Sequence, residues 1–281
     1  MGLADAYGVL PWYDLTVEPV DVYESARASA ILAYQLDPSI GEVYASLGYI
    51  SLHYELDWVN AERYLKKAVE MVPGSPPAHL WYANLLALVG RFEEAVTQCE
   101  QALALDPSSN ALVWGCAGHF MMAGRSDEAR ARHEQALATE ISIPWIFESF
   151  ARELGENEPK DSEKAGELLA EFATLFGYPF PDRMATVAGA FSGDREAQID
   201  AVAVLNDLAG RTVLDRSDLL FLYGQSAPPD VFFDVLGEAV NVRYLRLPFV
   251  PLFVSAWVPG LAEDPRWEDF LSLIGDPGQV N

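Results

Sequence analysis

Cysteine is scarce in this chain: only Cys99 and Cys116 occur among 281 residues. Two cysteines cannot build the disulfide framework that holds small secreted domains together. Both lie within segments whose apolar residues recur with helical spacing. We therefore expect them to be reduced, buried thiols in a cytoplasmic protein.

Positive charge is also scarce, because 18 basic residues stand against 42 acidic residues, a formal net charge of −24. The excess is spread along the chain, with 19 acidic and 8 basic residues among the first 141. Such a surface repels phosphate groups and anionic lipid headgroups. We expect this chain to bind neither nucleic acid nor a membrane, and expect a protein or peptide partner that is neutral or basic. Solubility alone is the alternative explanation of the charge.

Long hydrophobic runs are missing as well. The opening stretch MGLADAYGVLPWYDL has neither the basic region nor the uninterrupted apolar run of a secretory signal peptide. The most apolar segment, residues 247–261, is shorter than the roughly 20 residues that a membrane-spanning helix needs. Prolines at 248, 251 and 259 interrupt it. We expect a buried terminal helix there.

The sequence also lacks the motifs that carry common enzyme chemistry. It contains no GxGxxG, GxxxxGK[ST], GxSxG or HExxH pattern, and its four histidines are scattered at positions 53, 79, 119 and 133. Cys116 and His119 lie one helical turn apart, but two ligands do not complete a tetrahedral metal site. The sequence thus predicts no catalytic residue, no metal site and no cofactor, and a chain that is not an enzyme.

What the chain does contain is a repeated helical phrase. The stretch GRFEEAVTQCEQALALDP, residues 90–107, has counterparts that end at Pro38, at Pro73 and near Glu140. The step between successive prolines is first 35 and then 34 residues. Alanines seven residues apart recur in the phrases as Ala26/Ala33, Ala61/Ala68, Ala95/Ala102 and Ala129/Ala136. Each pair lies on one helical stripe, where a neighbouring helix can approach closely.

Partner helices lie between these phrases, in GEVYASLGYISLHYE, PPAHLWYANLLALVG and NALVWGCAGHFMMAG. A period of about 34 residues with two helices per unit is typical of tetratricopeptide repeats. The Leu47-Gly48 pair, the Gly90–Ala95 run and the Leu-Asp-Pro endings at 38 and 107 resemble that family. The resemblance implies an all-α, right-handed solenoid of helical hairpins, with about four repeats in residues 1–141.

Residues 142–281 are also helical in pattern, but the repeat phase is lost. We expect divergent helical repeats and C-terminal capping helices, at 144–155, 161–176, 180–192, 194–209, 216–224, 229–240, 249–258 and 265–274. The closing GLAEDPRWEDFLSLIG and the opening LADAYGVL resemble the C-terminal tetratricopeptide regions of bacterial multidomain regulators. Those proteins join the repeats to winged-helix domains, nucleotide cyclases or protein kinases.

In the tetratricopeptide fold, the first helix of each repeat lines a concave groove that binds partners. Transferred by register, the resemblance implies a groove lined by Tyr49, Leu52, His53, Leu80, Asn84, Leu88, Trp114, Met121 and Met122. Apolar, aromatic and methionine side chains are common at adaptable binding surfaces. The alternative is that the C-terminal helices fold back and bury these residues as core. Only Asn84 matches the residues with which some family members clamp a carboxylate, so we expect no such clamp.

The sequence therefore favours a non-catalytic interaction or scaffold module that holds a peptide or helix in the groove. The alternative is a regulatory effector domain of a transcription regulator or signalling enzyme, which binds a small apolar ligand between the repeats and the C-terminal helices. An enzyme on a helical-repeat scaffold is a third possibility, because a fold does not determine a function. The oligomeric state does not follow from the sequence.

Overall fold

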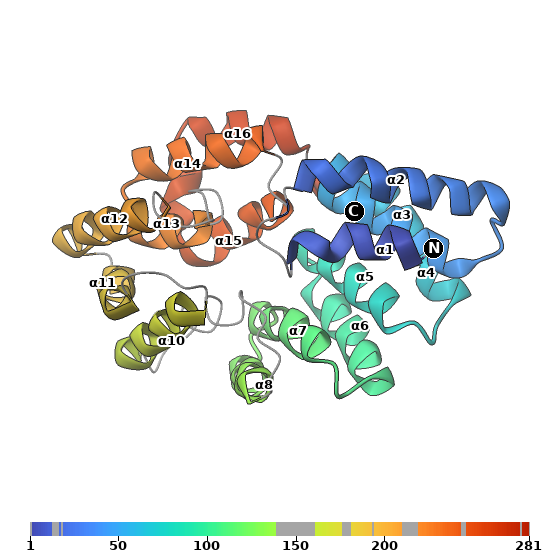
Figure 1. The fold of residues 1–281 in the computed structure, drawn as a ribbon, viewed down its shortest axis with the longest axis horizontal. Coiled ribbons are helices and arrows are strands. Elements are labelled where there is room, and N and C mark those ends of the chain that lie inside the picture. Colours follow the sequence, from blue (N-terminus) through green and yellow to red (C-terminus); the bar gives the residue numbers. More distant parts are fainter. Residues whose placement is uncertain are drawn as a thin grey trace. The chain divides into compact units, whose positions relative to one another are not determined.

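A computed structural model of the chain describes residues 2–12, 17, 19–138, 161–175, 181–192, 194–209, 219–242, 246–275 and 277–280. Within these ranges all regular structure is helical (Figure 1), which confirms the predicted all-α class. The helix expected at 144–155 lies outside the described residues. No helix in the described ranges is long and apolar enough to cross a bilayer.

The chain folds into two compact units. Unit 1 comprises residues 1–141, 245–252 and 268–281, and unit 2 comprises residues 142–244 and 253–267. Two short C-terminal segments thus belong to the same unit as the N-terminal repeats. The division into a repeat array and a divergent C-terminal domain stays a prediction.

Unit 1 is built from consecutive antiparallel helical hairpins. Their first helices are α1 (Gly2–Val9), α3 (Gly41–Ile50), α5 (Pro76–Leu88) and α7 (Asn110–Met122). Their second helices are α2 (Pro19–Leu36), α4 (Trp58–Met71), α6 (Phe92–Leu105) and α8 (Ser126–Leu137). Each helix packs on the next along the chain, and the first helices also touch one another from hairpin to hairpin. This is the arrangement of a tetratricopeptide-like solenoid, seen in the blue to green part of Figure 1.

Most of the small residues of the repeated phrase are buried. In α4, α6 and α8 the predicted alanine pairs are all buried, at 0–1% exposure: Ala61, Ala68, Ala95, Ala102, Ala129 and Ala136. In α2, Ala26 is buried but Ala33 is only half-buried. Gly48 of α3 allows the closest approach, since a Cβ there would lie 2.5 Å from Cγ of Leu65.

The repeat unit of 35 residues differs from the others at the end of its first helix. There α3 continues into a π-helical turn, η2 (Ser51–Glu55), in which the Leu56 N–H donates to the Ser51 carbonyl. A π turn is wider than an α turn and accommodates one inserted residue without ending the helix. The extra residue of this unit is therefore absorbed inside the helix, and the second helices α4, α6 and α8 stay 34 residues apart.

Unit 2 contains α10 (Ser162–Leu175), α11 (Met184–Gly189), α12 (Arg195–Ala209), α13 (Leu220–Ser226) and α14 (Pro229–Asn241), each packed on the next of those described. Short turns η3 (Pro181–Arg183) and η4 (Ala190–Ser192) flank α11. Every residue of α13 is buried. Gly224 makes this possible, because a Cβ there would lie 2.5 Å from Cε1 of Phe253.

The C-terminal helices contribute to both units. The described elements are η5 (Leu247–Phe249), α15 (Val250–Trp257), η6 (Pro259–Glu263), α16 (Arg266–Ile274) and η7 (Pro277–Val280). The helices predicted at 161–176, 194–209, 229–240, 249–258 and 265–274 are present with ends shifted by one residue at most. In unit 1, the Trp58 Nε1–H donates to the Ile274 carbonyl at 2.9 Å, which ties the end of α16 to the repeats.

Candidate functional site

Aromatic rings from several elements of unit 1 gather on the side that the first helices form. This aromatic cluster consists of Trp12, Tyr49, His53, Trp81, Trp114 and Phe249. Trp12 is at its centre, with ring centroids 5.9 Å from those of both His53 and Trp114. Its Nε1–H also donates to the Tyr49 hydroxyl at 2.7 Å. The indole thus joins residues that lie far apart in the chain.

The chain builds this cluster from local features of the first hairpin. Trp12 ends the short turn η1 (Leu10–Trp12), which continues directly from α1. A glycine in α1 lets the Tyr49 ring approach, because a Cβ at Gly8 would lie 3.2 Å from Cε1 of that ring. The Tyr54 hydroxyl donates to the Gly8 carbonyl at 2.9 Å, and burial raises the pKa of that phenol.

Phe249 of η5 closes the cluster from the C-terminal part of unit 1. Its ring centroid lies 5.8 Å from that of His53 and 6.3 Å from that of Trp12. Neither Trp12 nor Phe249 was among the predicted groove residues. Both lie outside the repeated phrase, so the repeat register carries no signal for them.

The predicted groove residues of α3 and η2 lie beneath these added rings. Tyr49, Leu52 and His53 are 4%, 0% and 3% exposed. Leu52 and His53 both lie in the π turn η2. At this end of the array, the first helices contribute to the core of unit 1.

The predicted residues of α5 and α7 are more open. Leu88 is buried at 7% exposure. The others are half-buried, and we call them the α5–α7 face: Leu80, Asn84, Trp114, Met121 and Met122. The two helices pack closely, since a Cβ at Gly115 would lie 3.0 Å from Cδ1 of Leu80. Across the same helix pair, His119 Nε2 lies 2.8 Å from Asn84 Oδ1.

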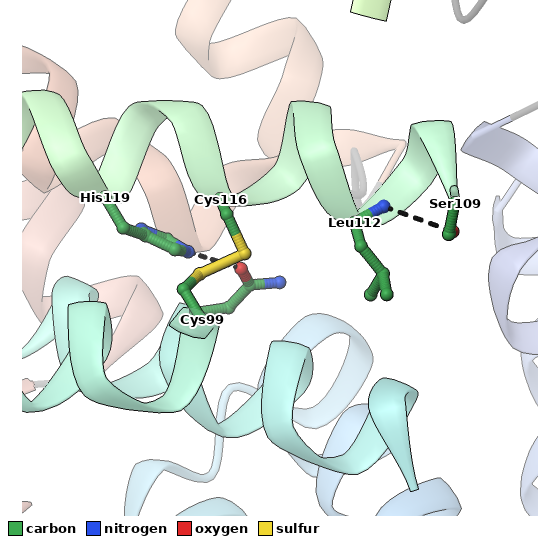
Figure 2. Close-up of a disulfide and its surroundings, with 6 residues drawn as sticks. Cys99, Ser109, Leu112, Cys116 and His119 are labelled. Carbon is green, nitrogen blue, oxygen red and sulfur yellow. Dashed lines mark hydrogen bonds between the residues drawn. A yellow bond between two sulfur atoms is a disulfide. The ribbon is translucent and has the colours of Figure 1, made fainter. Parts of the chain in front are cut away.

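The two cysteines are joined by a disulfide between α6 and α7 (Figure 2), so the expectation of reduced thiols is wrong. Both are fully buried, and their Cα atoms lie 5.6 Å apart, within the usual range for a disulfide. Cys99 lies on α6 between Ala95 and Ala102. We call these buried small residues of the repeated phrase the seam residues. The close helix approach that favours small side chains there also brings the two sulfur atoms together.

His119 lies one turn beyond Cys116 on α7, as Figure 2 shows, and is 4% exposed. Burial lowers the pKa of its imidazole to about 4, so the ring is neutral at pH 7. Because the Asn84 carbonyl oxygen can only accept, Nε2 carries the proton and donates to it. The Cys116 sulfur is bonded to Cys99, so Cys116 and His119 cannot act together as metal ligands. Among the described residues, no group of three or more His, Cys, Asp or Glu side chains could hold a metal ion.

The arginines at the start of α6 and α8 have structural partners. Arg91 and Arg125 lie 34 residues apart and each forms an ion pair with the preceding second helix, to Glu62 at 2.6 Å and to Glu100 at 3.1 Å. Each also bonds a glutamate three residues later, which lowers the pKa of that carboxyl group. These two arginines hold successive hairpins together.

Comparison with protein families agrees with this geometry. Residues 52–114 match one tetratricopeptide repeat family model, and residues 89–142 match a second. The described part of the matched stretch includes α4, α5, α6, α7 and α8, which form the regular portion of the solenoid. No curated protein matches the chain. The resemblance to bacterial multidomain regulators stays a prediction.

Proposed function

We propose that this chain is a non-catalytic interaction module that holds a peptide or short helix against the α5–α7 face. Tetratricopeptide repeats generally mediate contacts between proteins, and the repeat matches cover both helices of this face. The observation that carries the proposal is the partial exposure of Leu80, Trp114 and two methionines on adjacent helices. Apolar side chains gathered in this way gain stability when a partner removes them from water.

The chemistry of the face indicates what the partner offers. Leu80, Trp114 and the methionines provide apolar anchors, and methionine adapts to differently shaped side chains. Asn84 has amide N–H groups that can donate to a peptide carbonyl. The net charge of −24 favours a neutral or basic partner, because an acidic peptide would be repelled.

Binding measurements with paired variants test the proposal. The partner would be captured from the native cell with the full chain and identified by mass spectrometry, and its affinity measured by calorimetry. Leu80→Ala combined with Trp114→Ala is expected to weaken binding at least tenfold, since central aromatic anchors carry most of an interface's energy. Val59→Ala is the control, because Val59 is 54% exposed on α4, a second helix. If the double variant binds the partner as tightly as the wild type, the α5–α7 face is not the binding surface.

The alternative function is a regulatory effector domain that binds a small apolar ligand. The observation in its favour is the aromatic cluster, which contains three tryptophans within unit 1. A small ligand in this cluster would change tryptophan fluorescence, and Trp12→Phe would reduce that change. Native mass spectrometry of the purified chain separates the two functions, because it detects a bound small molecule or a bound peptide directly.

A further inference from the structure

The outer face of α2 differs in composition from the same face of the later second helices. It consists of Ala28, Ile31, Leu32, Gln35 and Leu36, which lie on one side of the helix. By the repeat register, the first four positions hold Arg63, Lys66, Lys67 and Glu70 in α4, and Thr97, Glu100, Gln101 and Ala104 in α6. In α8 the first three hold Ala131, Glu134 and Gln135. At the two central positions, α2 has Ile31 and Leu32 where each later second helix has two polar or charged residues.

This face is open to solvent within the chain. Leu32 is 55% exposed and Leu36 is 76% exposed. Among the described residues, six of the ten exposed large apolar side chains lie within the first 40 positions. Single exposed leucines are normal on a protein surface, whereas a contiguous apolar stripe marks a contact site.

The face also carries no charge, in a chain where 21% of residues are charged. No acidic or basic residue occurs from position 28 to position 36. At one end, the Arg27 guanidinium is engaged within the chain, with Nε 3.0 Å from Oε1 of Glu55. At the other end, Asp37 accepts from the backbone N–H and the hydroxyl of Ser39, which lowers the pKa of its carboxyl group. The charged residues directly before and after this stretch, Arg27 and Asp37, therefore have their own intramolecular bonds.

We propose that this face is a homodimer contact, in which α2 packs antiparallel against α2 of a second copy. Two copies each bear a net charge of −24, so they can meet closely only where no carboxylate must be buried. A two-fold contact pairs a surface with itself, which an uncharged stripe tolerates. The small Ala28 beside the large Leu32 and Leu36 suits interdigitation of two helices. A basic partner would instead select the acidic faces of the chain. The contact uses a different helix from the proposed function and does not depend on it.

The molar mass of the full chain in solution tests the proposal. Sedimentation velocity across a range of concentrations should show the mass rising from 30.9 kDa towards twice that value. Added salt should strengthen the association, because it screens the repulsion between two acidic bodies and leaves the apolar contact intact. A single mass of 30.9 kDa at every concentration would overturn the proposal. So would association that weakens with salt.

Variants locate the contact. Ile31→Lys with Leu32→Lys gives α2 the two lysines that α4 carries at the same positions, and is expected to yield a monomer at all concentrations. Circular dichroism and thermal unfolding verify that the variant folds. We expect it to fold, because Ile31 is only half-buried and Leu32 is exposed. Ile199→Lys is the matched control, because Ile199 is 58% exposed on α12, and should leave the dimer unchanged. A lysine variant that folds and still dimerises would overturn the assignment to α2.

A cysteine at the centre of the face supplies an independent measurement. Both natural cysteines are buried in one disulfide, so Leu32→Cys introduces the single free thiol. Near a two-fold axis, two such thiols should form an intermolecular disulfide under dissolved oxygen with a copper catalyst. The oxygen accepts the two electrons and two protons that the thiols lose, and becomes hydrogen peroxide. A covalent dimer from Leu32→Cys, and far less from Ile199→Cys, is expected. Equal yields from both variants would contradict an α2 contact.

Discussion

Leu56 has the left-handed backbone conformation that Gly90 has one repeat later, with φ of 54° and 79° respectively. Gly124 repeats it after a further 34 residues, with φ of 77°. Each of these residues lies between the two helices of a hairpin, where the chain must reverse. Glycine takes this conformation without steric cost, whereas a residue with a Cβ does not. The three hairpins thus turn through the same left-handed residue. In the hairpin with the inserted residue, that position is Leu56 rather than glycine.

Gly90→Ala is expected to lower the free energy of unfolding by about 1 kcal/mol, because the new Cβ strains the left-handed conformation. No atom lies within 4 Å of that Cβ, so crowding makes no contribution. Gly118→Ala is the matched control, since its Cβ would also meet nothing within 4 Å but its backbone is helical. That variant should gain roughly 0.5–1 kcal/mol. Urea unfolding measures both, and shifts of the same sign would contradict the assignment.

Gly48→Ala is expected to be more harmful, because its Cβ would lie 2.5 Å from Cγ and 3.1 Å from the backbone nitrogen of Leu65. Crowding of a packed core of this kind costs about 1–3 kcal/mol. Leu65→Ala should relieve part of the clash, so the double variant should be less unstable than the sum of the two single changes. Simple additivity in urea unfolding would show that α3 and α4 are not in close contact at this point.

Reduction of the Cys99–Cys116 bond is expected to lower the melting temperature of the protein. A disulfide that closes a loop of this size stabilises by about 3 kcal/mol, chiefly by restricting the unfolded chain. Cys99→Ala with Cys116→Ala should melt at the same temperature with and without a reductant, because it has no disulfide to reduce. Thiol titration of the unreduced, denatured wild type should detect no free thiol, and two thiols per chain would contradict the bond.

His119 should make the protein less stable as the solution is acidified. Its folded pKa of about 4 lies below the ordinary histidine value of 6.5, so the unfolded chain takes up the proton first. The stability that the neutral ring contributes is complete above pH 6.5 and is lost as the pH falls towards 4. This difference corresponds to about 3 kcal/mol. His119→Gln keeps an N–H donor for Asn84 but does not titrate. The gap in unfolding free energy between wild type and this variant should therefore change with pH, and a constant gap would contradict the assignment.

Much of the fold was predictable because its signals are local. Small residues seven apart and Leu-Asp-Pro endings recur in the repeats, and helical spacing of apolar residues places several helix ends within residues 161–274 to within a residue. The candidate site was predictable only in part. Leu80, Asn84 and Trp114 follow from the repeat register, which assigns them to the first helices. Trp12 and Phe249 lie outside the repeats, so no periodicity links them to Tyr49 and His53.

The sequence by itself determined the all-α class, the repeat period and the identity of the seam residues, because helix formation and its apolar periodicity depend on neighbours within a few turns. Only the tertiary structure decided that Cys99 bonds to Cys116 and that the Phe249 ring packs near His53. It also decided that the extra residue of the 35-residue repeat unit is accommodated in a π turn. These outcomes depend on the distance between helices and on segments far apart in the chain. Interactions of that kind are set by packing, which a linear pattern does not record.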